Sequence, residues 1–303
     1  MIITLRRLVF TLGFMSLATS LLGNDGPVYG DLKGQVLATG TRILLMDSAG
    51  KELWQHPGGN CHDIWMLDNG NVLFANGEII EVDPKTDKVV FKYTPEATKG
   101  GGAYACQRLD NGNTVVGENS AGRITEVDPA GKVVFKLDLP MISPGNHHNL
   151  RMVRKLDNGN YLVCHSKKRL VREYTPSGEV KFEVTVDTLA FSAVRLPNGN
   201  TMVGHISGVT EYSSDGKVLW TFSPKDLPEV SIGKITGIHV QPNGNIALGI
   251  YGIKKGANGA EFLEITHDKK LVWRYLPAKP ARWRMSVQVL TADGKPVPGK
   301  VLR

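Results

Sequence analysis

Histidines dominate the residues of this chain that could do chemistry, and a repeated pattern in the sequence maps five of the eight to one face of the fold. The pattern is anchored by five Asn-Gly-Asn triplets, whose glycines are Gly70, Gly112, Gly159, Gly199 and Gly244. Eight positions before these glycines stand His62, Tyr104, Arg151, Phe191 and Thr236. Six positions after them stand Asn76, Glu118, His165, His205 and Ile250. The segment SPGNHHNLR adds His147 and His148. Equivalent places of a repeat are expected to gather on one face of the fold.

Such a face suits three kinds of chemistry. A neutral imidazole of His62 or His148, the two candidates for catalysis, could attack a sulfuryl group or accept a phenol proton while Arg151 stabilises the anionic oxygens. Histidine and carboxylate side chains are also metal ligands, but no pair has the H-x-H or H-E-x-x-H spacing, so we assign no metal. The third is binding without catalysis. The candidates for binding are Tyr104, Glu118, His147, Arg151, His165, Phe191 and His205. A plainer alternative is that these polar groups only line a channel and bond to water and backbone.

The elements that position these residues follow from the repeat. Asn-Gly between two β-rich runs is a strong hairpin signal, and we expect a type I′ turn with positive φ at both central residues. After each triplet come a short apolar strand such as TVVG, a third strand such as GRITEVDP and a fourth such as KVVFKL. One position of the fourth strand is always aromatic, and we expect it to pack between neighbouring sheets. These aromatic residues are Phe91, Phe135, Phe182, Trp220 and Trp273. A four-stranded unit of about 40 to 50 residues is typical of a β-propeller blade.

The two ends of the chain complete the number of blades. Residues 34–56 contain the last three strands of a unit, and the C-terminal SVQVLTADGK supplies a first strand with its turn at Gly294. Pairing them would form a composite blade and remove an exposed strand edge. We therefore predict an all-β fold, a six-bladed β-propeller of four-stranded antiparallel blades closed by pairing of the C-terminal strand with the N-terminal blade. No linker divides it, so we expect one domain over residues 26–303.

Each repeat consists of a strand, Asn-Gly-Asn, a second strand and then EVDPAGKVVF or a variant with Trp. This order resembles the pyrroloquinoline-quinone-like propeller repeat. More narrowly, it resembles bacterial arylsulfotransferase-like propellers over nearly the whole chain after the N-terminal segment. The resemblance implies a quinoprotein-like fold and, as one activity, transfer of a sulfuryl group between phenolic substrates. Quinone-dependent relatives have eight blades and adjacent cysteines, and known arylsulfotransferases are longer with an extra N-terminal domain. This chain has about six blades and no Cys-Cys pair, so we expect no pyrroloquinoline quinone (PQQ) and assign no cofactor.

The first residues predict export. Arg6 and Arg7 precede an apolar run from Leu8 to about Leu22. The run is short for a membrane span and suits a signal peptide over residues 1–23, with an uncleaved N-terminal anchor as the alternative. We expect a periplasmic or extracellular protein that has no stable membrane span after signal cleavage.

The net charge and the number of cysteines limit the partners that we expect. The net charge is +7, the basic residues are scattered, and no nucleic-acid-binding motif occurs, so we expect anionic ligands and no nucleic acid. Cys61, Cys106 and Cys164 are odd in number, which means at least one free thiol or an intermolecular bridge.

Taken together, the patterns favour an exported, monomeric propeller that acts as a binding module through a His-rich face at its central channel. Its partner would be a small anionic or aromatic ligand, a glycan or a protein. The alternative is an arylsulfotransferase-like enzyme that uses one of the histidines.

Overall fold

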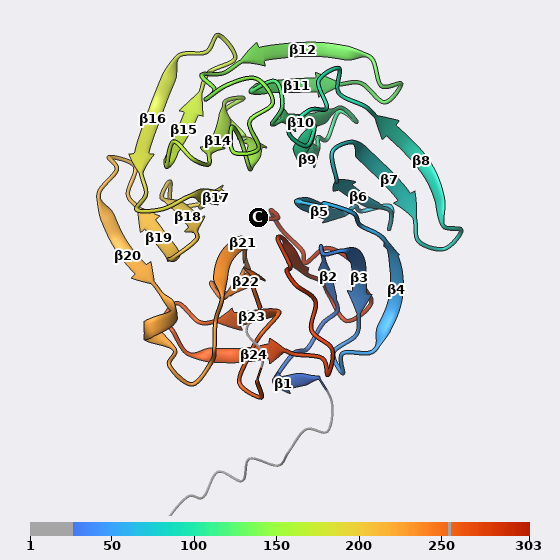
Figure 1. Ribbon diagram of the computed structural model, residues 1–303, viewed down its shortest axis with the longest axis vertical. Helices are drawn as coiled ribbons and strands as arrows, with labels where there is room; N and C mark the ends of the chain where they lie inside the picture. The colour runs from blue at the N-terminus through green and yellow to red at the C-terminus, as the bar shows by residue number, and fades with distance from the viewer. Residues whose placement is uncertain (1–26, 254–255) are drawn as a thin grey trace, which may run out of the picture.

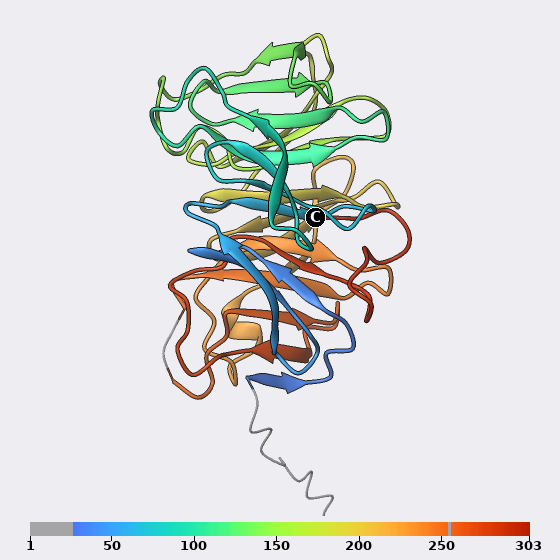
Figure 2. The same cartoon turned by 90° about the vertical axis from the view of Figure 1, so that its right-hand side faces the viewer.

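A computed structural model describes residues 27–253 and 256–303, which form six β-sheets arranged as a ring around a central axis (Figure 1). Figure 2 shows the ring from the side. The described residues contain no α-helix, and their one short helix is the 3-10 turn η1 (Pro224–Asp226). The prediction of an all-β, six-bladed propeller is therefore confirmed. No helix among these residues is long and apolar enough to cross a membrane. The predicted signal peptide lies outside the described residues.

Five blades are continuous in the chain, and we number them in chain order. Blade 1 contains β5 (Asp63–Met66), β6 (Val72–Ala75), β7 (Ile79–Asp83) and β8 (Lys88–Tyr93). Blade 2 contains β9 (Ala103–Arg108), β10 (Thr114–Glu118), β11 (Arg123–Val127) and β12 (Val133–Asp138). Blade 3 contains β13 (Val153–Lys155), β14 (Tyr161–His165), β15 (Leu170–Tyr174) and β16 (Val180–Thr185). Blade 4 contains β17 (Ala190–Arg195), β18 (Thr201–His205), β19 (Gly208–Tyr212) and β20 (Val218–Phe222). Blade 5 contains β21 (Lys234–Val240), β22 (Ile246–Tyr251), β23 (Phe262–Ile265) and β24 (Leu271–Tyr275).

Blade 6 combines the two ends of the chain. The C-terminal β25 (Val287–Val289) pairs antiparallel with β2 (Val36–Ala38), which continues into β3 (Arg42–Met46) and β4 (Glu52–Pro57). This pairing is the predicted closure of the ring. The sequence did not predict β1 (Val28–Gly30), which pairs with the outer edge of β24 as a fifth strand of blade 5. Because β1 leads into β2, it ties blade 5 to blade 6.

The Asn-Gly-Asn turns are not the type I′ turns that we expected. Among the described non-glycine residues, positive φ occurs only at Asp87, Arg169 and Lys269, so in each triplet only the glycine is left-handed, with φ of 83° at Gly70. The N–H of Leu67 donates to the carbonyl of Asn71 at 2.9 Å, which encloses a three-residue loop ending in that glycine. The N–H of Asn71 also donates to Oδ1 of Asn69 at 2.9 Å, and the same bond recurs in the other four turns. This side-chain bond mimics a backbone turn, and the first asparagine keeps a negative φ.

A repeated set of contacts, which we call the clasp, joins neighbouring blades. In blade 1, Asn71 Nδ2 donates to Glu81 at 2.7 Å, and Glu81 forms a salt bridge of 2.6 Å with Arg108 of blade 2. The Arg108 guanidinium lies 5.1 Å from the ring of Phe91, which pairs with Glu81 across β7 and β8. Blades 2 and 3 are joined by Glu126–Lys155 at 2.5 Å, and blades 3 and 4 by Glu173–Arg195 at 2.7 Å. The recurring aromatic residue therefore packs against the next blade.

Candidate functional site

A cavity of about 410 Å³ opens at one mouth of the channel, where the inner strands of the blades begin. This volume lies in the range of small-molecule sites. Its lining includes four residues that the repeat pointed to, His62, Arg151, Phe191 and Thr236, together with His147 and His148 of the segment before β13. The other lining residues are Asn60, Leu189, Ile206, Lys234, Tyr251, Arg282, Trp283 and Met285.

Arg151 is the central cation of the cavity. Its side chain is almost fully buried, with 5% of the residue exposed, and none of the described carboxylates lies within salt-bridge distance of it. The guanidinium lies 4.8 Å from the ring of Tyr104 and 5.2 Å from that of Phe191, and it donates one hydrogen bond of 3.0 Å to the carbonyl of His147. Its Nε has no partner among the described residues. Burial lowers the pKa of Arg151 to about 10, which leaves it charged at neutral pH.

His62 lines the cavity beside Arg151, whereas Tyr104, the fifth inner-strand residue of the repeat, contacts His62 and Arg151 but is not itself a lining residue. The rings of His62 and Tyr104 lie 3.9 Å apart, and both ring nitrogens of His62 are buried without a partner among the described residues. Burial, followed by the charge of Arg151, holds the pKa of His62 well below its usual value. The Tyr104 hydroxyl donates to the carbonyl of Gly100 at 2.9 Å. A Cβ on Gly101, whose φ is 109°, would lie 2.0 Å from that hydroxyl, so the glycine-rich segment packs directly on the tyrosine.

His147 and His148 line the same side of the cavity from the loop before β13. Nδ1 of His147 lies 2.5 Å from the Tyr104 hydroxyl, and Nδ1 of His148 lies 3.3 Å from Nη2 of Arg151. Burial and then the charge of Arg151 lower the pKa of both histidines, in the case of His148 to about 4. The histidines beside Arg151 are therefore neutral imidazoles at pH 7, able to donate or accept a hydrogen bond.

The opposite wall comes from the segment between β24 and β25. Trp283 forms an isolated bridge with Tyr251 of blade 5. Arg284 fixes this segment through a buried salt bridge of 2.6 Å with Glu261. We missed this wall because we did not extend the repeat to its sixth unit. Eight positions before Gly294 stands Ser286, directly beside the lining residue Met285.

The residues six positions after the triplet glycines do not reach the cavity. Glu118 accepts hydrogen bonds from Tyr93 and Thr125, both at 2.8 Å. His165 Nε2 lies 2.8 Å from the Tyr174 hydroxyl, and His205 Nε2 lies 3.1 Å from the Thr210 hydroxyl. All three side chains are buried, one strand further from the axis than the cavity. These histidine bonds stay within one blade, whereas Glu118 also joins blade 2 to blade 1 through Tyr93.

The channel is closed beneath the cavity. It narrows to a space of about 10 Å³, enough for one water-sized particle, bordered by His62, Asp63, Arg151 and Ser286 among others. Asp63 accepts two hydrogen bonds from Arg154, at 2.7 and 2.9 Å. The buried side chain of Arg303 donates to Ser286 at 2.6 Å, and Figure 1 shows this end of the chain at the centre of the ring. The cavity is thus a cup whose base contains Arg151 and the buried Asp63–Arg154 ion pair.

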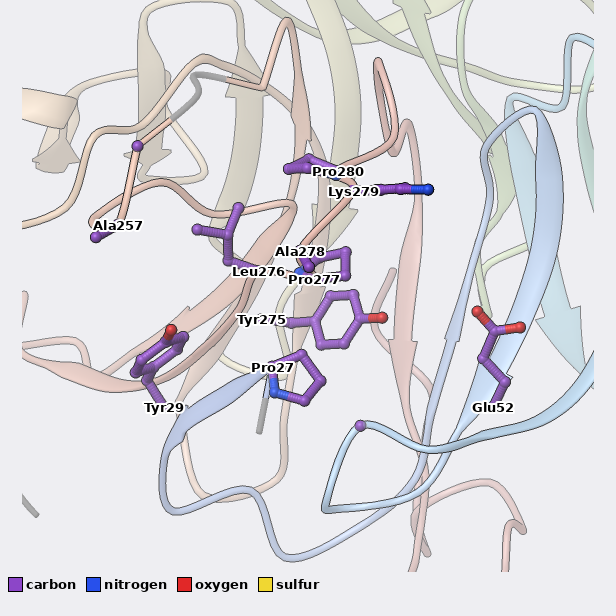
Figure 3. Close-up of a pocket in the computed structure, with 12 residues that line it drawn as sticks. Pro27, Tyr29, Glu52, Ala257, Tyr275, Leu276, Pro277, Ala278, Lys279 and Pro280 are labelled. Carbon is purple, nitrogen blue, oxygen red and sulfur yellow. The ribbon is translucent and has the colours of Figure 1, made fainter. Parts of the chain in front are cut away.

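A larger groove of about 910 Å³ lies at the rim, between β1, the loop before β4 and the segment after β24 (Figure 3). Its lining is mainly Pro27, Tyr29, Tyr275, Pro277 and Pro280, and the Tyr275 hydroxyl points toward Glu52 across the opening (Figure 3). The groove holds no buried charge that lacks a partner. The cup at the axis is therefore the stronger candidate for a functional site.

Metal binding finds no support in the cup. Among the residues that the structure describes, no group of three histidine, cysteine, aspartate or glutamate side chains is arranged to hold an ion. A guanidinium 3.3 Å from His148 also opposes the approach of a cation to that imidazole.

Comparisons with known proteins define the class as a β-propeller and go no further. No protein-family model and no curated protein sequence matches the chain. A protein of unknown function from Bacteroides caccae has a similar structure, with a TM-score of 0.72, 18% identity, and coverage of 84% of this chain and 98% of that one. A catalytically inactive histidine-to-alanine variant of virginiamycin B lyase from Staphylococcus aureus, solved with quinupristin, gives a TM-score of 0.56 at 12% identity, covering 83% and 89%. The WD40 propeller domain of Doa1 gives 0.54 at 16% identity, covering 82% and 76%.

These likenesses support the fold, because identities this low carry no activity with them. The two neighbours with a stated identity are a lyase and a WD40 domain, so the resemblance of the repeat to quinoproteins and arylsulfotransferases stays a prediction.

Proposed function

We propose that this protein is an exported binding module that holds a small anionic ligand with an aromatic or other flat group in the cup at the mouth of its channel. The observation that carries the proposal is Arg151, a buried guanidinium with no described carboxylate as its partner. A buried cation is costly unless an opposite charge compensates it, and an anionic ligand would supply that charge. Export rests on the N-terminal segment alone, and we assign no cofactor, no nucleic acid and no second subunit.

The remaining lining residues indicate the shape of the ligand. Lys234 and Arg282 lie in the cup wall, whose lining residues include no carboxylate. Phe191, Tyr251 and Trp283 supply aromatic surface, and the unpartnered imidazole nitrogens of His62 supply a donor and an acceptor. A carboxylate, sulfate or phosphate on an aromatic or sugar ring would satisfy the guanidinium and the imidazole while its ring packs on the aromatic side chains. A glycan, or an acidic aromatic segment of a protein, could present the same groups.

The second candidate is sulfuryl transfer, which the neutral imidazole of His148 beside Arg151 favours. An imidazole nitrogen would attack sulfur as the S–O bond breaks and a phenolate leaves, and a second phenol would then take the sulfuryl group. Arg151 would stabilise the charge on the oxygens. The inactive histidine variant of the similar lyase provides an analogy for a propeller that depends on a histidine.

Calorimetric titration with 4-hydroxybenzoate and its neutral isostere 4-hydroxybenzamide tests the binding proposal. We expect the benzoate to bind at least tenfold more tightly, and we expect Arg151→Met to remove the difference, since a charge-assisted hydrogen bond contributes about 1.5–3 kcal/mol. Equal binding of the two compounds, or a preference that survives in the variant, would contradict it.

Release of nitrophenolate from 4-nitrophenyl sulfate in the presence of a phenol separates the two candidates. The binding module should show none. Acceptor-dependent release that disappears in His148→Gln or His62→Gln, in protein that still melts normally, would establish the transferase and name its histidine.

A further inference from the structure

The clasps between blades provide an internal comparison that points to a second site on the opposite face. The cation of each clasp stands four positions before the triplet glycine of the following blade, at Arg108, Lys155 and Arg195. In each case it meets the third-strand glutamate of the preceding blade and lies beside an aromatic ring, at 5.1 Å for Arg108 and 4.9 Å for Arg195. Three junctions of the ring are thus glutamate–aromatic sites occupied by a cation from the chain itself.

Blade 5 keeps the glutamate and the aromatic ring but has no cation. Glu264 pairs with Trp273 across β23 and β24, as Glu173 pairs with Phe182 in blade 3. The place four positions before Gly294 is Leu290. Glu264 is buried, and it accepts hydrogen bonds only from the neutral groups of Asn245, Trp273 and Gln241. Burial, offset in part by these bonds, raises the pKa of this carboxyl group.

At the two remaining junctions, no glutamate is left without a basic partner. Between blades 6 and 1, the place of the glutamate is taken by Leu45, which pairs with Trp54, and the place of the cation by Met66, so both charges are absent together. Between blades 4 and 5, the cation position is Val240, but Nε2 of His267 lies 3.2 Å from Glu211 in its stead. Among the clasp carboxylates, Glu264 alone has no basic group of the described chain as a partner.

A cavity of about 390 Å³ opens directly on Glu264. It lies beside the Asn-Gly-Asn turn of blade 5, at the end of the inner strand away from the cup, with Trp273, Leu290 and Asn245 in its wall. Its one lysine, Lys33, is largely exposed and forms a salt bridge of 3.2 Å with Asp31, also in the lining. The lining therefore has two carboxylates and one ammonium group.

We propose that this cavity is a binding site for a guanidinium or primary ammonium group, which occupies beside Glu264 and Trp273 the place that Arg108 and Arg195 occupy in their clasps. The chemistry of recognition is the same as in those clasps: a charge-assisted hydrogen bond to a buried carboxylate together with a cation–π contact. The cation comes either from a free small molecule or from an arginine or lysine side chain of a peptide. The site shares no residue with the cup, so its test does not depend on the proposed function.

Titration calorimetry with n-butylguanidinium and with n-butylurea, a neutral compound of nearly the same shape, tests the proposal. We expect the guanidinium to bind at least tenfold more tightly, and Glu264→Gln to bring the two affinities within twofold of each other. Binding of the two compounds with equal affinity, or a preference for the guanidinium that Glu264→Gln leaves intact, would overturn it.

A second variant supplies the missing cation from within. Leu290→Arg places a guanidinium at the position of Arg108 and Arg195, so it should reduce n-butylguanidinium binding to the level of n-butylurea, whereas Leu290→Met should leave the wild-type preference. If folded Leu290→Arg protein binds the guanidinium as wild type does, the correspondence with the clasps is wrong. Should Leu290→Arg fail to fold, the Glu264→Gln comparison still decides.

The peptide acetyl-Gly-Arg-Gly-amide distinguishes the two sources of the cation. Tighter binding of the peptide than of n-butylguanidinium would identify a side chain of a partner protein as the natural occupant. Weaker binding would identify a free small cation. Either result supports the site, provided that Glu264→Gln loses the binding of both the peptide and n-butylguanidinium.

Discussion

Replacing Arg151 by methionine should abolish anion binding without destabilising the ligand-free protein. The pKa of this guanidinium is lowered from 12.5 to about 10, chiefly because it is buried. An arginine whose pKa is lowered by folding destabilises the folded state at every pH below about 10, because the unfolded chain holds the proton more tightly. At pH 7 this corresponds to about 3 kcal/mol.

Methionine removes that cost and fills much of the same volume, but it also loses the contacts of the guanidinium. The hydrogen bonds to the His147 carbonyl and to Nδ1 of His148 together contribute about 2 kcal/mol. The contacts with the rings of Tyr104 and Phe191 together contribute about 1 kcal/mol. These contributions nearly cancel, so the net effect on the free energy of unfolding is close to zero and Tm should change by less than roughly 2–4 °C.

Arg154→Met is the matched control, since it makes the same change in a guanidinium that has its partner. Arg154 forms two hydrogen bonds with Asp63, so its loss leaves that buried carboxylate with Arg303, 3.8 Å away, as its one remaining cation among the described residues. We expect it to destabilise the protein by about 3–5 kcal/mol. Thermal and urea denaturation at pH 7 measure both. If Arg151→Met lowers the free energy of unfolding by 2 kcal/mol or more, Arg151 stabilises the ligand-free fold, and the assignment of the cup as an anion site is refuted.

Three further predictions concern the surroundings of the cup and the thiols. Gly101→Ala should lower the free energy of unfolding by about 2 kcal/mol and weaken benzoate binding, because the residue has positive φ and its Cβ would collide with the Tyr104 hydroxyl. Unchanged thermal stability in a melting experiment would show that the loop adapts. Because the pKa of His148 is lowered to about 4, the ligand-free protein should lose stability as pH falls from 6.5 toward 4, while an anion that favours the imidazolium should bind more tightly over the same range. Titrations at pH 5.0 and 7.5 measure this, and an equal pH effect in His148→Gln would assign it to another group. Burial raises the pKa of all three free cysteine thiols, so the folded protein should not react with a thiol reagent such as dithionitrobenzoate. The denatured chain should yield three thiols without prior reduction, and a smaller yield would reveal a disulfide.

The sequence predicted most of the fold because turn chemistry and strand order repeat in it, and five copies of one hairpin leave few alternative architectures. It predicted the turn type incorrectly because Asn-Gly alone does not reveal that the asparagine side chain would bond to the backbone two residues on. It did not predict β1, since three residues with no repeated counterpart give no signal.

For the candidate site, counting from the triplet glycines found residues that line one cavity on the inner strands, whereas the counted residues of the second strands lie away from it. Inner-strand entries such as His62 and Arg151 face the axis in any propeller, so their position alone brings them together. At the second strand, the repeat position fixes where in the blade a side chain lies, but not which group it forms a hydrogen bond with. His165 and His205 bond to hydroxyl groups of the third strand, and no spacing rule predicts those bonds.

The uneven distribution of clasps implies that the seams of the ring respond differently to conditions. The three ionic seams between blades 1 and 4 depend on carboxylates, which acid neutralises and salt screens. Apolar clusters lie at these seams too, but the cluster between blades 4 and 5 is larger than theirs, and there Val209 and Phe222 pack with Ile235 and Leu248. Apolar contacts weaken on cooling, so this seam should depend on temperature more than the others. Acid and cold should therefore open the ring at different seams, which amide hydrogen exchange of the inner strands would locate.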